Sequence, residues 1–228
     1  MSDLVSTYPT YLWKEFLTDW NREVLGWDEF IEDFKMGEAL FYAEEHFDVS
    51  IADKLPTEWL GYPGATEVQL AQAEARLGIT FPPSYRQFLV VSNGWRGLTT
   101  EVDHLYSTDE VDWLRVREQH VIDLALKYGI NDCTDDEYLA YDENGADIHE
   151  CCRSRYVPTA LQISTRKWGL GDIWLLNPQV VSADGEWEAW HDTGCAYGPF
   201  RYQSFWAMVQ AECKRHREYV EQKRREDQ

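Results

Sequence analysis

A pair of adjacent prolines, Pro82 and Pro83, constrains the fold of this chain more than any other feature. They interrupt the segment RLGITFPPSYRQFLVVSNGW at residues 76–95, because proline fixes its φ angle and cannot donate inside a helix. Ser84 follows as a good N-cap, and an Asn-Gly pair ends the apolar pattern that comes next. That pattern has helical spacing and comprises Tyr85, Phe88 and Leu89. We therefore predict a short helix that starts at a rigid elbow.

The residues before the prolines carry the signals of another helix. Thr66 and Gln69 have the spacing of a capping box, in which each side chain bonds to the other residue's backbone N–H. Gly78 stands where a helix would end in the left-handed conformation. The apolar face between these signals comprises Leu70, Ala73 and Leu77. The two helices beside the elbow must bury their stripes against a shared core, and this structural role needs no reactive group.

Helices are also expected at both ends of the chain and in its middle. Two aromatic-rich patterns with helical spacing occupy residues 13–24 and 27–34. Residues 108–128 predict one helix, with Thr108 as its cap. A final helix starts near residue 203, and its highly charged end is expected to project into solvent.

After residue 130 the pattern changes from helical to strand-like. Short aromatic or β-branched runs alternate with clusters of Gly, Pro, Asn and Asp, which is typical of strands joined by turns. The runs are YLAYD (138–142), ALQIST (160–165), GDIWLLNP (171–178) and EWEAWHD (186–192). Helices, then strands, then a closing helix favour an α+β fold with a mostly antiparallel central sheet and helices packed beside it.

The charge of the chain is large, negative and unevenly spread. The net charge is −20, and residues 1–152 hold 31 of the 41 acidic but only 10 of the 21 basic residues. Such a surface repels phosphate backbones, so we expect no direct nucleic-acid partner. A basic protein is its natural counterpart, although acidity can also serve solubility alone.

The sequence also indicates a cellular compartment. The start, MSDLVSTYPTYLWKEF, has neither the basic region nor the apolar run of a signal peptide. No stretch approaches the roughly 20 apolar residues that a membrane span needs, so no membrane partner is expected. Five cysteines, an odd number, favour reduced thiols in the cytoplasm.

The segment EVQLAQAEARLGITFPPSYRQFLVVSNGW, at residues 67–95, closely resembles the entry motif of the SMI1/KNR4 family, within the SUKH superfamily. GLGDIWLLNP (169–178) is similar to the family's Gly-Asp strand, and YQSFWAMVQ (202–210) to its Ser-Phe closing helix. The residues that match the entry motif are Glu74, Leu77, Gly78, Phe81, Pro82, Ser84, Tyr85, Phe88, Leu89, Asn93 and Gly94.

The resemblance covers roughly residues 62–212 and so divides the chain. We interpret residues 1–61 as a helical N-terminal extension and residues 213–228 as the charged end of the closing helix. Two features depart from the family pattern. Trp95 stands where the family often has a second glycine, and the segment at 130–152 is more acidic than expected.

The resemblance implies a function class as well as a central sheet with helices beside it. Most bacterial members look like immunity proteins of polymorphic toxin systems, which bind and neutralise a cognate toxin, often a nuclease. Fungal relatives look like intracellular scaffolds, and this is the alternative function. The chain lacks the low-complexity arm of those relatives, which favours the immunity function. The family lends no catalytic residue, so we expect a non-enzymatic protein.

The acidic stretch NDCTDDEYLAYDENGADIHE, at residues 131–150, holds eight carboxylates and no Lys or Arg. Clustered carboxylates would attract a basic toxin and speed its association in a salt-dependent way. The alternative is a solvated loop and edge strand whose charges deter strand pairing. The candidate partner-binding residues in this stretch are Asp132, Asp135, Asp136, Glu137, Asp142, Glu143 and Asp147.

Tryptophans in the strand region are further candidates. Trp187 and Glu188 face opposite ways in a strand, and Trp190 shares the face of Glu188. An outward tryptophan beside carboxylates is a good binding hot spot, so Trp187 and Trp190 join the candidate partner-binding residues. The alternative is that all of these aromatic side chains belong to the core.

The sequence gives little evidence for a metal site or for a catalytic thiol. DENGAD, at residues 142–147, lacks the full calcium-loop pattern, and the adjacent Cys151 and Cys152 are poorly placed to chelate one zinc ion. Nothing identifies the oxyanion hole that a Cys–His hydrolase would need. We therefore expect no metal and no cofactor. The thiols and imidazoles considered for a hydrolase are Cys195 and Cys133, with His191 and His104.

Overall fold

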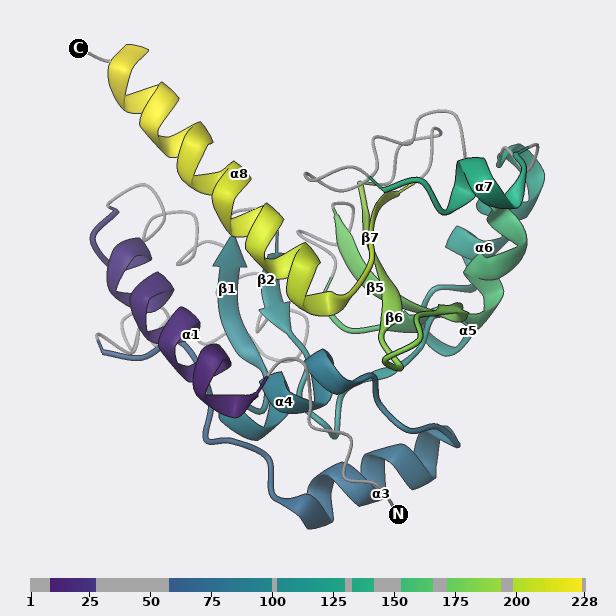
Figure 1. Ribbon diagram of the computed structural model, residues 1–228, viewed down its shortest axis with the longest axis horizontal. Helices are drawn as coiled ribbons and strands as arrows, with labels where there is room; N and C mark the ends of the chain where they lie inside the picture. Colours follow the sequence, from purple (N-terminus) through teal and green to yellow (C-terminus); the bar gives the residue numbers. More distant parts are fainter. Residues whose placement is uncertain are drawn as a thin grey trace, which may run out of the picture.

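Figure 1 shows two sheets surrounded by helices, with a long closing helix that runs out toward the C-terminus. The computed structural model describes residues 9–27, 58–99, 102–129, 133–141, 153–165, 172–193 and 199–226. Helices and antiparallel sheets occur together, which confirms the predicted α+β class.

The larger sheet has five strands in the order β3-β4-β5-β6-β7, and every neighbouring pair is antiparallel. Three of the predicted runs supply its centre, as β4, β5 and β6. The longest pairing is between β5 and β6, where Leu175 lies opposite Trp190. The strands are β3 (Asp112–Trp113), β4 (Leu161–Gln162), β5 (Ile173–Val181), β6 (Trp187–Asp192) and β7 (Phe200–Tyr202).

A smaller two-stranded sheet, β1 (Trp95–Thr99) and β2 (Val102–Leu105), was not predicted. Its strands are short and carry charged residues, and Gly97 takes a φ of 49°, so no clean apolar alternation marks them. A single bridge between Leu105 and Ser164 links this sheet to the strand region.

The two helices beside the elbow are confirmed as α3 (Glu67–Leu77) and α4 (Pro83–Val91). Thr66 and Gln69 form the predicted capping box, and Gly78 is left-handed with φ 71°. The predicted cap of α4 is wrong, because Pro82 occupies the N-cap. Ser84 lies inside the first turn, where its N–H and hydroxyl both donate to the buried carboxylate of Glu186, at 2.7 and 2.6 Å.

The single helix predicted over residues 108–128 is also wrong. Residues 112–113 pair with β4 as strand β3, and the chain then forms α5 (Leu114–Arg117) and α6 (Gln119–Tyr128). Glu118 interrupts the two helices with φ −137° and ψ 53°. The apolar spacing is therefore real, but pairing with the sheet overrides a continuous helix.

Helices at the two ends of the chain share one core. α1 (Thr10–Val24) and α8 (Phe205–Glu226) match two of the predicted patterns, whereas the pattern at 27–34 lies almost wholly outside the described residues. The Trp13 ring lies 5.4 Å from the ring of Phe88 on α4 and 5.5 Å from that of Phe205 on α8. α1 thus packs directly on the predicted domain, while the boundary at residue 61 stays a prediction.

The five-stranded sheet is buried on both faces. One face contributes Trp174, Leu176 and Ala189 to the large core that includes α1, α4 and α8. The other face contributes Leu175 and Trp190 to a smaller core with α5, α6 and the 3₁₀ helix η2 (Ser154–Thr159). Because both faces of the sheet are covered, a strand side chain can contact a partner only where the covering elements leave it exposed.

Candidate functional site

The acidic stretch contains a short helix, α7 (Asp135–Tyr138), where a strand was predicted at 138–142. Thr134 begins it with a capping box. The Glu137 N–H donates to the threonine hydroxyl at 3.2 Å, and the Thr134 N–H donates to the Glu137 carboxylate at 2.8 Å. The strand prediction is wrong because these local bonds favour a helical turn over the aromatic strand pattern.

The three acidic residues of α7 are exposed but differ in their contacts. Asp135 forms an ion pair with the buried Arg153 at 2.5 Å, and Glu137 serves the capping box. No residue in the described part of the chain pairs with Asp136, which leaves its carboxylate available to a partner. Four other candidates lie outside the described residues, namely Asp132, Asp142, Glu143 and Asp147.

Tyr138 anchors α7 to the sheet. Its side chain is fully buried, and the guanidinium carbons of two arginines lie over its ring, Arg201 at 3.7 Å and Arg153 at 4.4 Å from the centroid. Its hydroxyl donates a hydrogen bond to Glu188 at 2.9 Å. Cation–π contacts are stronger when desolvated, so this stack holds the acidic helix in a defined position.

Glu188 and Arg201 form a buried ion pair under α7, with 2.8 Å between Arg201 Nη1 and Glu188 Oε1. Both side chains are almost completely inaccessible to solvent. Glu188 accepts further bonds of 2.7 to 2.9 Å, which compensate for its desolvation. These come from the hydroxyls of Tyr138 and Tyr141, the amide of Asn177 and the indole of Trp190.

The two tryptophan candidates belong to the core. Trp190 shares the face of Glu188, as the alternation predicts, and its indole N–H donates to that carboxylate. Its side chain is nevertheless fully buried, and Trp187 is only 9% exposed on the opposite face. The outward rim expected from Trp187 and Trp190 is therefore wrong, because helices cover the sheet on both sides.

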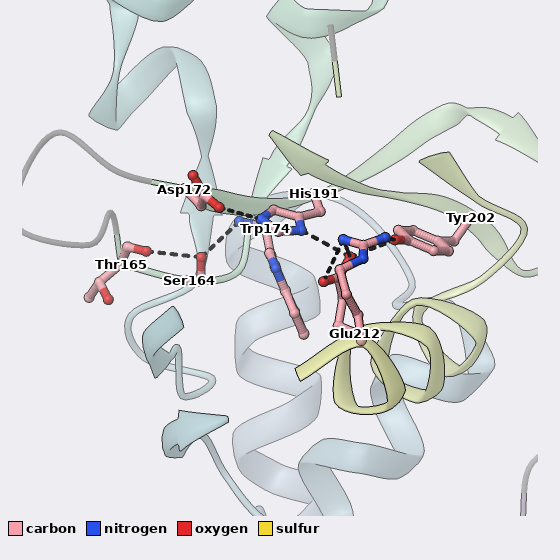
Figure 2. Close-up of polar contacts among 8 residues, drawn as sticks. Ser164, Thr165, Asp172, Trp174, His191, Tyr202 and Glu212 are labelled. Carbon is pink, nitrogen blue, oxygen red and sulfur yellow. Dashed lines mark hydrogen bonds and ion pairs between the residues drawn. The ribbon is translucent and has the colours of Figure 1, made fainter. Parts of the chain in front are cut away.

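A second buried charge cluster surrounds His191 on the other face of β6, and Figure 2 shows the residues that meet there. The imidazole lies 2.7 Å from Asp172 through Nε2 and 2.9 Å from Glu212 through Nδ1. Burial lowers the pKa of His191, but the bonds and charges of these two carboxylates outweigh it and raise the pKa to about 9.

Glu212 is also held by two other groups, because the Tyr202 hydroxyl donates to it at 2.5 Å and Arg215 pairs with it at 3.0 Å. Burial raises the pKa of Glu212, but His191 and Arg215 outweigh this and lower it. At neutral pH the cluster thus holds an imidazolium between two carboxylates. A group in that state cannot act as a general base.

The cysteines differ from the expectation of reduced thiols. Cys133 is disulfide-bonded, and the cysteines that could serve as its partner lie outside the described residues. Cys213 is a free, buried thiol whose pKa burial raises well above its usual value. Cys133 therefore does not supply a free nucleophile, and Cys195 lies outside the described residues.

In the described part of the chain, no group of three or more His, Cys, Asp and Glu side chains is arranged to hold a metal ion. No helix among the described residues combines the length and apolar character that crossing a bilayer requires.

Comparison with known proteins supplies the family. The model of the SMI1 / KNR4 family (SUKH-1) matches residues 64–210, which is more than half of the chain. The chain belongs to this family. Proteins with SMI1/KNR4 domains are generally non-enzymatic and of the immunity type. No curated protein matches the chain.

The matched range holds most of both buried charge clusters, which sequence reasoning did not identify, while Glu212 and Arg215 of the second cluster lie just beyond it. Glu188 and His191 lie in β6, and Arg201 lies in β7, inside the matched range. The signal was present in EWEAWHD, where Glu186, Glu188, His191 and Asp192 interrupt an otherwise apolar strand. A strand that is covered on both faces must pair such groups, because an unpaired buried charge is costly.

Proposed function

We propose that this protein is an immunity protein that binds a cognate, basic toxin domain, such as a nuclease, and neutralises it without any catalysis of its own. Membership of the SMI1/KNR4 family carries this proposal, because the family is known for immunity proteins of toxin systems. The site of action would be the cytoplasm, where a nuclease toxin meets its substrate.

The charge of the chain supports a basic partner. The net charge is −20, and most of the acidic excess lies in the first two-thirds of the sequence. Complementary charge steers two proteins together and can raise association rates to roughly 10⁸ M⁻¹s⁻¹ or more at low salt. An inhibitor that must capture a toxin before it acts benefits from such speed.

The acidic helix α7 is the described part of the proposed contact surface. Its three carboxylates are exposed, while the guanidinium groups of Arg153 and Arg201 both lie over the buried ring of Tyr138. A charged segment that is already ordered loses little conformational entropy on binding. Asp132, Asp142, Glu143 and Asp147 extend the proposed acidic surface by sequence.

A non-enzymatic mechanism agrees with the state of the buried histidine. Asp172 and Glu212 outweigh burial and raise the pKa of His191 to about 9, so the buried imidazole is not poised as a general base near neutral pH. Neutralisation would follow from occupying the toxin's active site or substrate path with a stable protein surface.

Co-expression tests the proposal directly. The product of each open reading frame that neighbours this gene would be expressed in a susceptible host, with and without the full-length protein, to find a toxin among them. We expect restored growth and a stoichiometric complex of the two purified proteins by size-exclusion chromatography with light scattering. Absence of both rescue and complex formation would contradict the immunity function and leave the scaffold role as the better explanation.

A further inference from the structure

A disulfide bond lies beside the acidic helix α7. Its described half is Cys133, which directly precedes Thr134, the N-cap of α7. The chain has five cysteines, and Cys213 is a free thiol buried in α8. The partner of Cys133 is therefore one of the other three cysteines, which are Cys151, Cys152 and Cys195.

Arg153 brings the chain that follows the adjacent pair Cys151 and Cys152 close to Cys133. Its guanidinium donates to the carbonyl oxygen of Cys133, with 3.4 Å between Nη2 and that oxygen. Since consecutive Cα atoms are only about 3.8 Å apart, both cysteines of the pair lie within two positions of the residue that makes this contact. The contact favours Cys151 or Cys152 as the partner.

Such a bond would reinforce the contacts that hold α7. This helix has only four residues, so its position depends on tertiary contacts. Arg153 supplies two of them, because it pairs with Asp135 and lies over the Tyr138 ring. A bond from Cys133 to the cysteine pair would close a loop around α7, and closing a loop limits how far the chain can spread when those contacts open.

The proposed cytoplasmic site makes this bond conditional. Disulfides are rare in a reducing cytosol, and those that form there are usually transient and catalytic or redox-sensing. Cys133 is half-buried, so a small thiol can reach it, whereas Cys213 is only 2% exposed. Cys151 and Cys152 are neighbours in sequence, so the one that does not bond to Cys133 lies next to the one that does. Redox-sensing cysteines often have such a second cysteine beside them.

We propose that the Cys133 disulfide is a redox-controlled clamp on α7, formed with Cys151 or Cys152 and opened by a low-molecular-weight thiol such as glutathione. The thiolate of the small thiol attacks one sulfur, and the other cysteine leaves as a thiolate that takes up a proton. A second small thiol then frees the first cysteine, so two cysteine thiols and one small-molecule disulfide result. The reverse exchange, with that small-molecule disulfide as the oxidant, closes the clamp.

This inference rests on the proposed function for the role of α7 and adds its regulation. The oxidised protein presents an ordered acidic helix to the toxin, whereas the reduced protein presents a loosened one. Redox state thereby sets how well the acidic surface is preorganised for binding.

Peptide mapping of the full-length protein tests the bond. The protein is equilibrated in glutathione buffers from strongly oxidising to strongly reducing, alkylated, denatured and cleaved by chymotrypsin. Cleavage after Tyr138 and Tyr141 separates Cys133 from the cysteine pair. We expect a fragment that links Cys133 to Cys151 or Cys152 in oxidising buffers and its loss in reducing ones. A link to any other cysteine, or a bond that persists in the most reducing buffer, would overturn the clamp.

Hydrogen exchange in the same buffers measures the effect on α7. Its amides should exchange about tenfold faster in the reducing buffer, because local opening is no longer restrained, while those of α3 should not change. Cys133→Ser should give the fast rate in both buffers. Cys195→Ser is the matched control and should respond as the unaltered protein does. Equal α7 rates in both buffers, despite a mapped loss of the disulfide, would contradict the proposal.

Neither readout contains the toxin, so the clamp and the immunity function can fail separately. A failed co-expression rescue would overturn the immunity function while the redox response of α7 stays measurable. Rescue by a protein whose α7 does not respond to glutathione would overturn the clamp alone.

Discussion

The hydroxyl of Tyr138 donates a hydrogen bond to the carboxylate of Glu188 across fifty positions of sequence, at 2.9 Å. This bond joins the acidic helix α7 to the centre of the main sheet. Since α7 has only four residues, its position depends on such tertiary contacts more than on its own helix propensity.

Tyr138→Phe should therefore loosen α7. The variant keeps the ring and its contacts with the two arginines but removes one donor from a buried carboxylate. We expect a loss of about 1–2 kcal/mol in the free energy of unfolding by urea, together with faster amide exchange in α7. Tyr128→Phe is the control, because Tyr128 is exposed and should change neither quantity. Equal behaviour of the two variants would show that the Tyr138 bond does not hold α7.

The buried pair of Glu188 and Arg201 should be costly to break from one side. Glu188→Leu leaves the Arg201 guanidinium buried without its counter-ion, and we expect a loss of about 3–5 kcal/mol in unfolding free energy. The double variant Glu188→Leu/Arg201→Met removes both charges and should recover much of that loss. A double variant as unstable as the sum of the two single variants would mean that the pair is not coupled.

The helices beside the elbow could be predicted from sequence because their signals are local. The Thr66–Gln69 capping box, the left-handed Gly78 and the proline pair each act within a few residues. The central strands were predictable for a similar reason, since short apolar runs stand between clear turn signals. Local and tertiary preferences agree in these segments.

The remaining features depend on partners that are distant in sequence. Residues 112–113 form a strand instead of the predicted helix because they pair with β4. Ser84 donates a hydrogen bond to Glu186, which lies 102 positions later in the chain, in the hairpin between β5 and β6. The prediction that Trp187 and Trp190 form an exposed rim is wrong for the same reason. Side-chain alternation predicts on which face of the strand Trp190 lies, but not whether other elements cover that face. Within the candidate site, the exposure of the α7 carboxylates agrees with the prediction, and their contact with a partner is a proposal.

The contact between Ser84 and Glu186 predicts a pH-dependent effect on stability. The Glu186 carboxylate lies at the N-terminus of α4, where it accepts from both the N–H and the hydroxyl of Ser84. Burial raises the pKa of Glu186 above 4.5, although the bonds from Ser84 oppose the rise. Ser84→Ala removes one of those bonds, so it should disfavour the ionised carboxylate and destabilise the fold by about 1–3 kcal/mol at pH 7.

The destabilisation caused by Ser84→Ala should be smaller in acid, because a protonated Glu186 carboxyl depends less on the hydrogen bond from the Ser84 hydroxyl. Chemical unfolding measures the loss of unfolding free energy at pH 7 and at pH 4.5. Ser182→Ala, in the hairpin that carries Glu186, is the control for a general destabilisation of that hairpin. A loss for Ser84→Ala that is identical at the two pH values would contradict this explanation.

Asp136 should affect how fast the toxin associates. Asp136→Lys reverses an exposed charge that no described residue pairs with, so the fold should stay intact. If the immunity function holds, we expect several-fold slower association at about 50 mM salt and a smaller difference at about 500 mM, because salt screens exposed charges. Stopped-flow mixing with the toxin domain measures both rates.

Glu15→Lys on α1 makes the same change in net charge on an exposed site away from α7 in Figure 1. An equal slowing by both variants would indicate that only the total charge matters. No slowing by either would assign the α7 carboxylates to solubility alone.

His191 predicts that the protein loses stability as the solution becomes alkaline. Its pKa is about 9 in the folded protein against 6.5 for an ordinary histidine. The native state therefore binds a proton that the unfolded state releases between these values, and this stabilisation is complete below about pH 6.5. It should fall by about 3 kcal/mol as the pH rises through 9.

His191→Gln identifies the group responsible. The variant cannot hold a positive charge between Asp172 and Glu212, so it should be much less stable than the unaltered protein at pH 6.5. The difference should narrow at pH 9.5, where the imidazole has also lost its proton. His120→Gln, which changes an exposed imidazole, should leave the slope of unfolding free energy against pH unchanged. A His191→Gln profile parallel to that of the unaltered protein would mean that the buried histidine is neutral in the folded state, and that Arg215 and the Tyr202 hydroxyl hold Glu212 without a charged imidazole.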